Sequence, residues 1–188
     1  MIVLGVDPGT AIVGYGLIKK ERNVIEVLDY GCIYTEPSLM MAKRLQIIYR
    51  GINNILSLYK PESVAIEDIF YFKNNKTVIK VGQARGVIIL AAAENGIETY
   101  DYTPLQVKMG VTGYGRADKK QIQLMVKKIL KLNEIPKPDD AADGLAIALT
   151  HLNSLGSGLL QYRDKSVSKK VARRKDRITY KEYQDLYK

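Results

Sequence analysis

IVLGVDPGTAIVGYG, residues 2–16, is the stretch that decides the fold of this chain. Its first six residues form a nearly continuous apolar run ending in Asp7, which is typical of a strand buried on both faces. Pro8-Gly9-Thr10 then interrupt the run with turn-forming residues. Two further strands are predicted over 12–19 and 24–34, with 21–23 as the hairpin loop between them. Because these connections are short, we expect the first three strands to pair in antiparallel fashion.

Helices and strands alternate in the rest of the chain. Ser38 is expected to cap a helix over 39–59, and Pro61 follows its end. A fourth strand is predicted over 63–67, ending on Glu67, and a fifth over 97–102. Further helices are predicted over 74–95, over 103–109 with Thr103 as its cap, over 118–132 and over 140–156, with a flexible loop over 110–115. Long helices between the later strands favour parallel crossovers, so we expect an α/β domain over 1–158 with a mixed five-stranded sheet and helices on its faces.

The predicted helix over 74–95 contains VIILAAA, residues 87–93, which is apolar nearly all the way round. A helix that is apolar on more than one side must be covered on more than one side. One interpretation is simple burial in the core. The other places the sheet on one side and a second subunit on the other, which predicts a homodimer.

The composition is that of one globular domain: 188 residues, 46% hydrophobic and 26% charged. No apolar run approaches the roughly 20 residues of a membrane helix, and the N-terminus has no signal-peptide pattern, so we expect no membrane association. A single cysteine, Cys32, cannot form an internal disulfide, which suits the cytoplasm. A net charge of +9 favours a polyanionic partner such as nucleic acid.

Much of this charge lies in the last segment, 159–188, which we expect to be a basic extension separate from the domain. Residues 163–188 hold ten Lys/Arg and four Asp/Glu, a net charge of +6. One hypothesis is a DNA-binding arm, whose deletion would weaken binding and flatten its salt dependence. The alternative is a partly disordered tail that improves solubility or docks a partner.

Four carboxylates are the candidate metal ligands. Asp7 and Glu67 end predicted strands, at the sheet edge where α/β proteins bind ligands. Asp140 and Asp143 are three residues apart at the start of a helix, so they lie on one face of it. Four carboxylates in one place repel unless cations lie among them, and such oxygen ligands suit Mg²⁺ or Mn²⁺. Two such ions can activate a water and stabilise the leaving oxygen in phosphodiester hydrolysis.

Each acid also has a structural interpretation. Asp7 before Pro8 could be a turn former, and Glu67 a solvated strand end. Asp140 could cap the helix, and Asp143 could complement its dipole. Two neighbouring acids are left out of the site. Asp68 is expected to point to the opposite face of the strand from Glu67. Asp139 is expected to be the cap of the helix that holds Asp140.

Five segments in one order make the chain resemble the bacterial RuvC family of crossover (Holliday) junction endodeoxyribonucleases. The resemblance runs over about residues 2–156. Its motifs after the opening stretch are AIEDIFYFKN (65–74), VGQARGVIILAAA (81–93), LQVKMGVTGYGRADKKQIQ (105–123) and DDAADGLAIALTH (139–151). The resemblance implies a ribonuclease-H-like fold of the retroviral integrase superfamily. It also implies a homodimer that binds a four-way DNA junction and nicks two opposed strands symmetrically, in recombination and repair, with RuvA–RuvB as partners.

By the same resemblance, Asp7, Glu67, Asp140 and Asp143 correspond to the family's catalytic acids, with Mg²⁺ as cofactor and Mn²⁺ as a substitute. Lys108 and Lys119 match cations near the scissile phosphate, and Phe70 matches an aromatic residue that stacks on unpaired bases. Further basic side chains that could contact DNA phosphates are Lys73, Lys76, Lys80, Arg85 and Arg116. Without the resemblance, Lys108 and Lys119 are better explained as surface lysines, and each of the other five cations is equally well explained as a solvated charge.

Two other classes compete with the junction nuclease. DPGTAIVGYG also resembles the first phosphate loop of actin-like ATPases, but 188 residues leave no room for that fold's second domain. A related nuclease for another branched nucleic acid, or a non-catalytic nucleic-acid-binding relative, also fits the fold. The presence of all four acids argues against the non-catalytic reading. The lone histidine, His151, lies about two turns beyond Asp143 and is expected to be structural.

Overall fold

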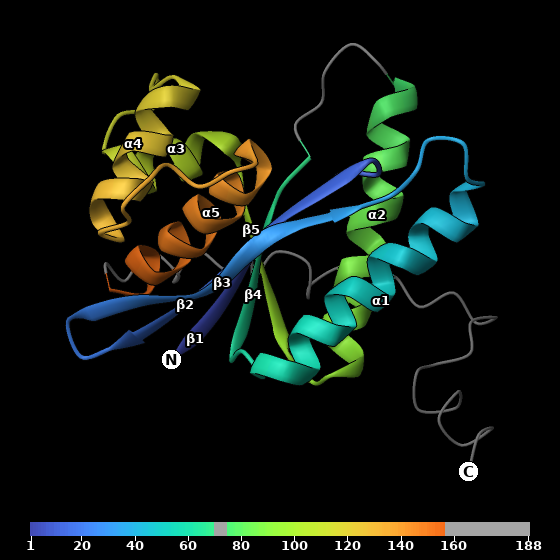
Figure 1. Ribbon diagram of the computed structural model, residues 1–188, viewed down its shortest axis with the longest axis horizontal. Coiled ribbons are helices and arrows are strands. Elements are labelled where there is room, and N and C mark those ends of the chain that lie inside the picture. The colour runs from blue at the N-terminus through green and yellow to red at the C-terminus, as the bar shows by residue number, and fades with distance from the viewer. Residues whose placement is uncertain (70–74, 157–188) are drawn as a thin grey trace, which may run out of the picture.

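The computed structural model describes residues 1–69 and 75–156. Its core is a five-stranded sheet in the order β3-β2-β1-β4-β5 (Figure 1). The strands are β1 (Ile2–Asp7), β2 (Ile12–Glu21), β3 (Val24–Tyr34), β4 (Ser63–Glu67) and β5 (Glu98–Tyr102). The pairs β1–β2 and β2–β3 are antiparallel, whereas β1–β4 and β4–β5 are parallel. The expected mixed five-stranded sheet is therefore confirmed.

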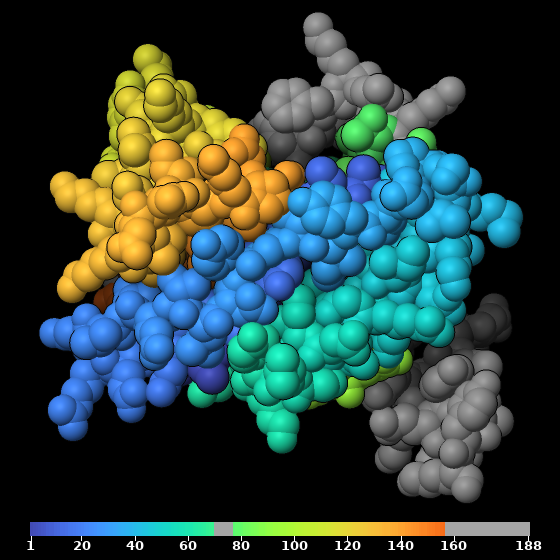
Figure 2. All heavy atoms as spheres, in the orientation of Figure 1, coloured from blue at the N-terminus to red at the C-terminus, as the bar shows by residue number. Residues whose placement is uncertain are grey.

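Helices cover both faces of this sheet. On one face lie α1 (Met41–Tyr59) and α2 (Asn75–Glu94), and on the other α3 (Pro104–Thr112), α4 (Lys119–Ile129) and α5 (Asp139–Gly156) (Figure 1). Side chains of β1 alternate between the two resulting cores: Leu4 packs with α1 and α2, and Val3 packs with α5. In the space-filling view, the outer strand β3 crosses the molecule between α5 (orange) and α1 (teal) (Figure 2).

Three predicted helix boundaries are wrong, and one of them is the end of α4, which lies at Ile129 rather than at 132. Ser38 does not cap α1, because the chain makes a turn in which the Leu39 N–H donates to the Glu36 carbonyl, and the helix begins two residues later. The helix capped by Thr103 runs to Thr112, so the expected loop loses its first three residues. Gly110 lies inside this helix, and a Cβ there would meet the Thr150 side chain of α5 at 2.7 Å. The glycine therefore marks a close helix contact rather than a loop.

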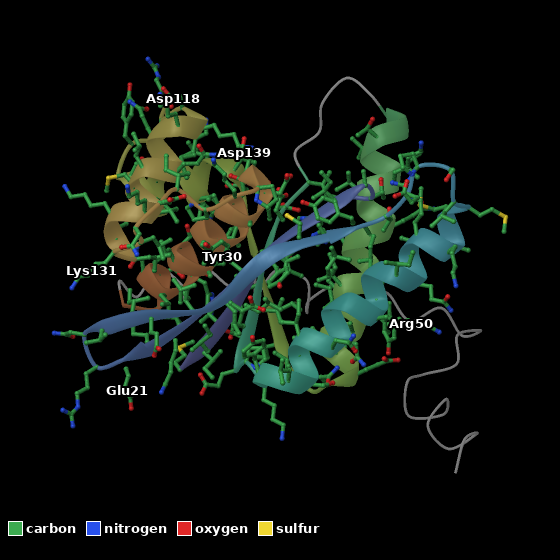
Figure 3. All side chains as sticks on the ribbon, viewed as in Figure 1. Glu21, Tyr30, Arg50, Asp118, Lys131 and Asp139 are labelled. Carbon is green, nitrogen blue, oxygen red and sulfur yellow. The ribbon has the colours of Figure 1, made fainter. Side chains whose placement is uncertain are left out.

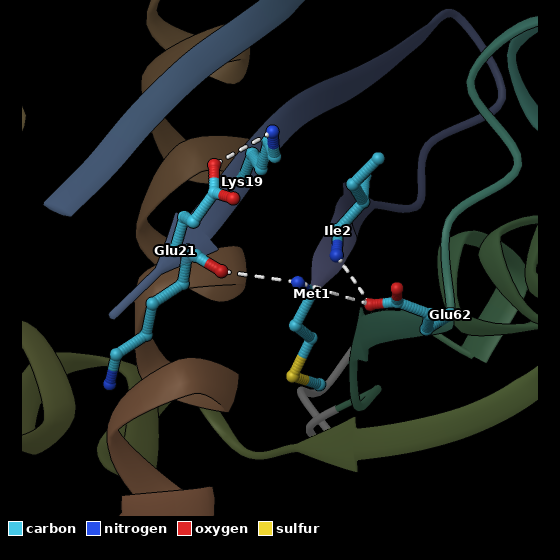
Figure 4. Close-up of polar contacts among 6 residues, drawn as sticks. Met1, Ile2, Lys19, Glu21 and Glu62 are labelled. Carbon is cyan, nitrogen blue, oxygen red and sulfur yellow. Dashed lines mark hydrogen bonds and ion pairs between the residues drawn. The ribbon is translucent and has the colours of Figure 1, made fainter. Parts of the chain in front are cut away.

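The start of β1 is fixed to its neighbours by polar contacts (Figure 4). The Ile2 N–H donates to the Glu62 carboxylate over 2.6 Å, and the ammonium group of Met1 donates to the carbonyl of Lys20. Lys19 and Glu21 form an exposed ion pair alongside, 3.0 Å apart. These contacts support the register between β1, β2 and β4, and hence the level at which the strands end.

The helix α2 buries one side and exposes another. Its inner residues pack against α1 and the sheet: Ala84, Ile88, Ala91 and Ala92. Its outer side carries an exposed stripe at helical spacing: Ile79, Gln83, Gly86, Leu90 and Ala93. Within residues 1–69 and 75–156, no helix has the length and apolar character needed to cross a membrane.

Candidate metal centre

Two of the four candidate acids end adjacent parallel strands. Val6 of β1 pairs with Ile66 of β4, so the next residues, Asp7 and Glu67, end their strands side by side. Val3 of β1 and Ala65 of β4 belong to the core on the α5 side. Because side chains alternate along a strand, Asp7 and Glu67, an even number of residues further on, face the same side. Their carboxylates therefore point to the α5 face at the carboxyl edge of the sheet.

The other two acids lie in the first turns of α5, which approaches the sheet through glycines. An ideal Cβ on Gly14 would lie 1.9 Å from the carbonyl oxygen of Asp140, and one on Gly144 would lie 2.4 Å from the carbonyl carbon of Tyr15. Only glycine permits such backbone contact at these positions. Gly14 pairs directly with Asp7 across the β1–β2 ladder. The start of α5 is therefore held over the end of β1, which brings Asp140 and Asp143 to the strand acids.

The acids are near enough to one another to influence each other's pKa values. Burial raises the pKa of Asp7 to about 6, with further contributions from Asp143 and Asp140. The pKa of Glu67 is raised to about 7, mainly by burial and to a smaller extent by the charges of Asp7 and Asp143. The pKa of Asp143 is raised by burial, against the opposing effect of Lys119. Near neutral pH, Glu67 is thus partly protonated, and a bound cation would displace that proton.

Lys119, at the start of α4, is the cation that lies among these acids. Its Nζ is 3.2 Å from Asp143 and 3.7 Å from Asp139. Figure 3 shows the same end of the molecule, where the cap of α4, Asp118, and the start of α5, Asp139, project from neighbouring helices. Burial opposes the charge of Lys119, but Asp143, Asp139 and Asp140 outweigh it and raise its pKa. The resemblance implies a place for this lysine near the scissile phosphate, and in the structure it forms an ion pair with Asp143.

The four acids supply partly buried carboxylate oxygens, which are the type of ligand that a divalent cation such as Mg²⁺ prefers. As the side chains stand, no three acidic, histidine or cysteine groups of the described chain are gathered closely enough to enclose an ion. Asp143 is instead paired with Lys119. An ion would be held by Asp7 and Glu67 from the strands, with Asp140 and Asp143 turning toward it from α5.

Sequence reasoning missed one neighbour of the acids, Cys32. It pairs with Gly14 across the β2–β3 ladder, so Cys32, Gly14 and Asp7 form one row across the sheet. Burial raises the pKa of the Cys32 thiol, with smaller effects from Asp140 and Asp7. The thiol therefore stays protonated at neutral pH. Counting the hairpin register back from the predicted 21–23 turn would have paired Gly14 with Tyr30 instead, because the actual turn is one residue shorter and the register shifts again between Leu17 and Ile18.

The predicted DNA contacts differ in availability. Lys80 and Arg116 are exposed, and Lys108 is half-buried on α3. Arg85 forms an ion pair with Asp101 of β5, 2.5 Å apart, and its side chain is only 20% exposed. This ion pair links α2 to strand β5 of the sheet. Phe70 and Lys73 lie outside the described residues, as does the side chain of Lys76.

His151 is structural, as expected. It is fully buried, its Nδ1 shares a 2.7 Å hydrogen bond with the Tyr102 hydroxyl, and its ring lies 4.5 Å from that of Tyr100. Burial lowers its pKa to about 4, so the ring stays neutral at physiological pH. The adjacent acids also stay outside the site: Asp68 is exposed and accepts a hydrogen bond from the Ile69 N–H. Asp139 is the first residue of α5 rather than its cap.

The sheet order, the helices on its two faces and the acids at its carboxyl edge define a domain of the ribonuclease-H-like class. Comparison with known proteins narrows this class. The family model described as "Crossover junction endodeoxyribonuclease RuvC" matches residues 3–151. The chain belongs to this family.

Individual relatives support this family assignment. The crossover junction endodeoxyribonuclease RuvC of Fusobacterium nucleatum is 57% identical over the full length of both chains. A solved structure of RuvC from Thermus thermophilus is 37% identical, with a TM-score of 0.78, covering 84% of this chain and 97% of that one. A structure of T. thermophilus RuvC in complex with Holliday junction substrate matches at 35% identity, with the same TM-score and coverage. The Fusobacterium match extends over 159–188, so the basic extension has a counterpart in that relative.

Proposed function

We propose that this protein is a metal-dependent endonuclease that resolves Holliday junctions by nicking two opposed strands near the crossover. The observation that carries the proposal is the group of four acids at one sheet edge, two of them with pKa values raised to about 6 and 7. Such a group is unfavourable without a cation and well suited to holding one. Membership of the RuvC family supplies the substrate, a four-way DNA junction.

The four acids would hold Mg²⁺, with Mn²⁺ as a substitute, and the bound ions supply a nucleophilic water and stabilise the leaving oxygen. Asp7 and Glu67 provide fixed ligands, because the hydrogen-bonded ladder between β1 and β4 sets their separation. Lys119 is placed to change partners. If Asp143 bound a metal instead, the ammonium group of Lys119 would be available to stabilise negative charge developing on the scissile phosphate.

A homodimer would place two such centres on the two opposed strands. The exposed stripe of α2 supports this arrangement, because Ile79 and Leu90 are 62% and 51% exposed at helical spacing around an open glycine, Gly86. A second copy of the chain placed there would cover the apolar side chains. RuvA–RuvB would be the branch-migration partners, and the cytoplasm, where bacterial chromosomal DNA lies, the compartment.

A synthetic four-way junction and a linear duplex of the same sequence, each incubated with Mg²⁺, Mn²⁺ or Ca²⁺, test the activity. We expect paired nicks confined to the junction with Mg²⁺ or Mn²⁺. Junction binding without cleavage under every condition would favour the non-catalytic alternative, and equal cleavage of the duplex would favour a different nuclease.

Asp7→Asn tests the site. It keeps the size of the side chain and removes its charge, so cleavage should fall below detection while junction binding in Ca²⁺ persists. Asp68→Asn is the matched control, since Asp68 lies next to Glu67 but is exposed, and it should cut like the unmodified protein. Cleavage by Asp7→Asn at the normal rate would show that the acids named here are not the site.

A further inference from the structure

The helix α1 begins without a cap. Met40 precedes it and supplies no side-chain hydrogen bond, and the first turn holds no acidic residue. The Lys43 N–H donates to the Met40 carbonyl over 2.9 Å, but the N–H groups of Met41 and Ala42 have no partner among the described residues. Free N–H groups and the positive end of the helix dipole favour an anion at this point.

Arg44, in the next position of the same turn, is a buried cation without a carboxylate. It is 8% exposed, and no ion pair links it to an acid within residues 1–69 and 75–156. Its Nε donates to the Thr35 hydroxyl over 2.8 Å. Its two terminal nitrogens make no hydrogen bond in the described chain, yet they are not sealed from solvent as the Nε of Arg85 is. Burying a charge is unfavourable unless the charge is paired. Within the described residues, the guanidinium group of Arg44 has no anionic partner.

Arg44 is joined by hydrogen bonds to the loop that follows Asp7. The Thr35 hydroxyl, which accepts from Arg44, donates to the Thr10 carbonyl, and the Thr35 N–H donates to the Ala11 carbonyl over 2.9 Å. Arg44 therefore lies at the sheet edge that carries the acids, but on the α1 side, since α1 and α5 cover opposite faces. A ligand held there would lie beside the metal centre without entering it.

We propose that Arg44 and the free N–H groups at the start of α1 form a binding site for a phosphate group of the DNA backbone. The proposal rests on the proposed function, because that function brings DNA to this edge. A guanidinium fork matches two phosphate oxygens, and helix N–H groups match a third. The contact reads no base, and it links the DNA through Thr35 and Thr10 to the turn that follows Asp7.

Substitution tests the charge. Arg44→Gln should weaken junction binding in Ca²⁺ about 5- to 20-fold near physiological salt, equally for different sequences, and lower the slope of log K against log salt by about one. Arg50→Gln, two turns further along α1, is the control. Arg50 is exposed (Figure 3), and its loss should leave both quantities unchanged. A folded Arg44→Gln with normal affinity and slope overturns the site, while failure of the unmodified protein to bind the junction overturns the proposed function as well.

A second measurement needs no substitution, in case Arg44→Gln does not fold. In ¹⁵N NMR spectra of the unmodified full chain with Ca²⁺, the N–H signals of Met41 and Ala42 and the Nε–H signal of Arg44 should shift when the junction is added. Inorganic phosphate at the same phosphate concentration should shift them far less. If the signals around Asp7 move with the junction and these three do not, the phosphate site is refuted. If only inorganic phosphate moves them, Arg44 and these N–H groups bind a small anion rather than DNA, and the proposal is also refuted.

Discussion

Gly14→Ala is the sharpest test of how the site is assembled. The added Cβ would lie 1.9 Å from the Asp140 carbonyl oxygen, 2.4 Å from its carbonyl carbon and 2.9 Å from its Cβ. Real Cβ atoms essentially never come within 3.0 Å of another heavy atom, so the start of α5 must withdraw by about 1.1 Å or more. These contacts are mainly backbone, and no side-chain rotation can relieve them.

A displacement of about 1 Å in a catalytic group can lower a rate roughly 100-fold. We therefore expect Gly14→Ala to cut junctions about 100-fold more slowly and to need more Mg²⁺, because Asp140 and Asp143 move away from Asp7. Overpacking should also lower the free energy of unfolding by about 1–3 kcal/mol. Junction binding in Ca²⁺ should change little.

The assay is single-turnover cleavage of a labelled junction across a Mg²⁺ titration, with urea unfolding in parallel. Gly156→Ala is the control at the other end of α5, where an added Cβ meets nothing within 4 Å. Normal cleavage by Gly14→Ala at the normal Mg²⁺ requirement would refute the reasoning, since α5 would then not be held in place by this glycine.

Three further predictions concern charge and assembly. Glu67→Gln should stabilise the metal-free protein, because folding raises the pKa of Glu67 from 4.5 to about 7 and so lowers stability as the pH rises through that interval. Urea unfolding should show a gain of about 1–3 kcal/mol at pH 8 that vanishes below pH 4.5. Leu90→Glu should shift the protein from dimer to monomer in sedimentation, whereas Leu58→Glu, at a 73% exposed position on α1, should not. Deleting residues 159–188 should weaken junction binding and flatten its salt dependence, and unchanged affinity and slope would favour a tail without DNA contacts.

Most of the fold could be predicted because it follows from local patterns. The apolar run before Asp7 and the short hairpin loop gave the antiparallel strands, and the long helices gave the parallel ones. Thr103 caps α3 as predicted, since its side chain accepts from the Gln106 N–H three residues on. Proline and glycine signals placed most of the remaining helix ends within a few residues.

The rest depends on contacts between segments far apart in the sequence. Nothing near Gly110 indicates that Thr150 lies against it, so the glycine was read as a loop residue. The start of α1 is a local exception: Ser38 has the side chain of a cap, but the Leu39 N–H donates to the Glu36 carbonyl in a turn, and the helix begins at Met41. Arg85 was read as a free cation because Asp101, its ion-pair partner, lies on another element. Arg44 was overlooked because a basic residue on an amphipathic helix is ordinarily a surface charge.

The glycine contact between β2 and α5 has a consequence for evolutionary change. The position of the helix acids relative to Asp7 depends on backbone atoms touching backbone atoms at Gly14 and Gly144, not on the shapes of the surrounding apolar side chains. Substitutions elsewhere in the two cores can then accumulate without moving the acids. The family can diverge to 37% identity while the architecture persists, and the tolerance for drift should end abruptly at these two glycines.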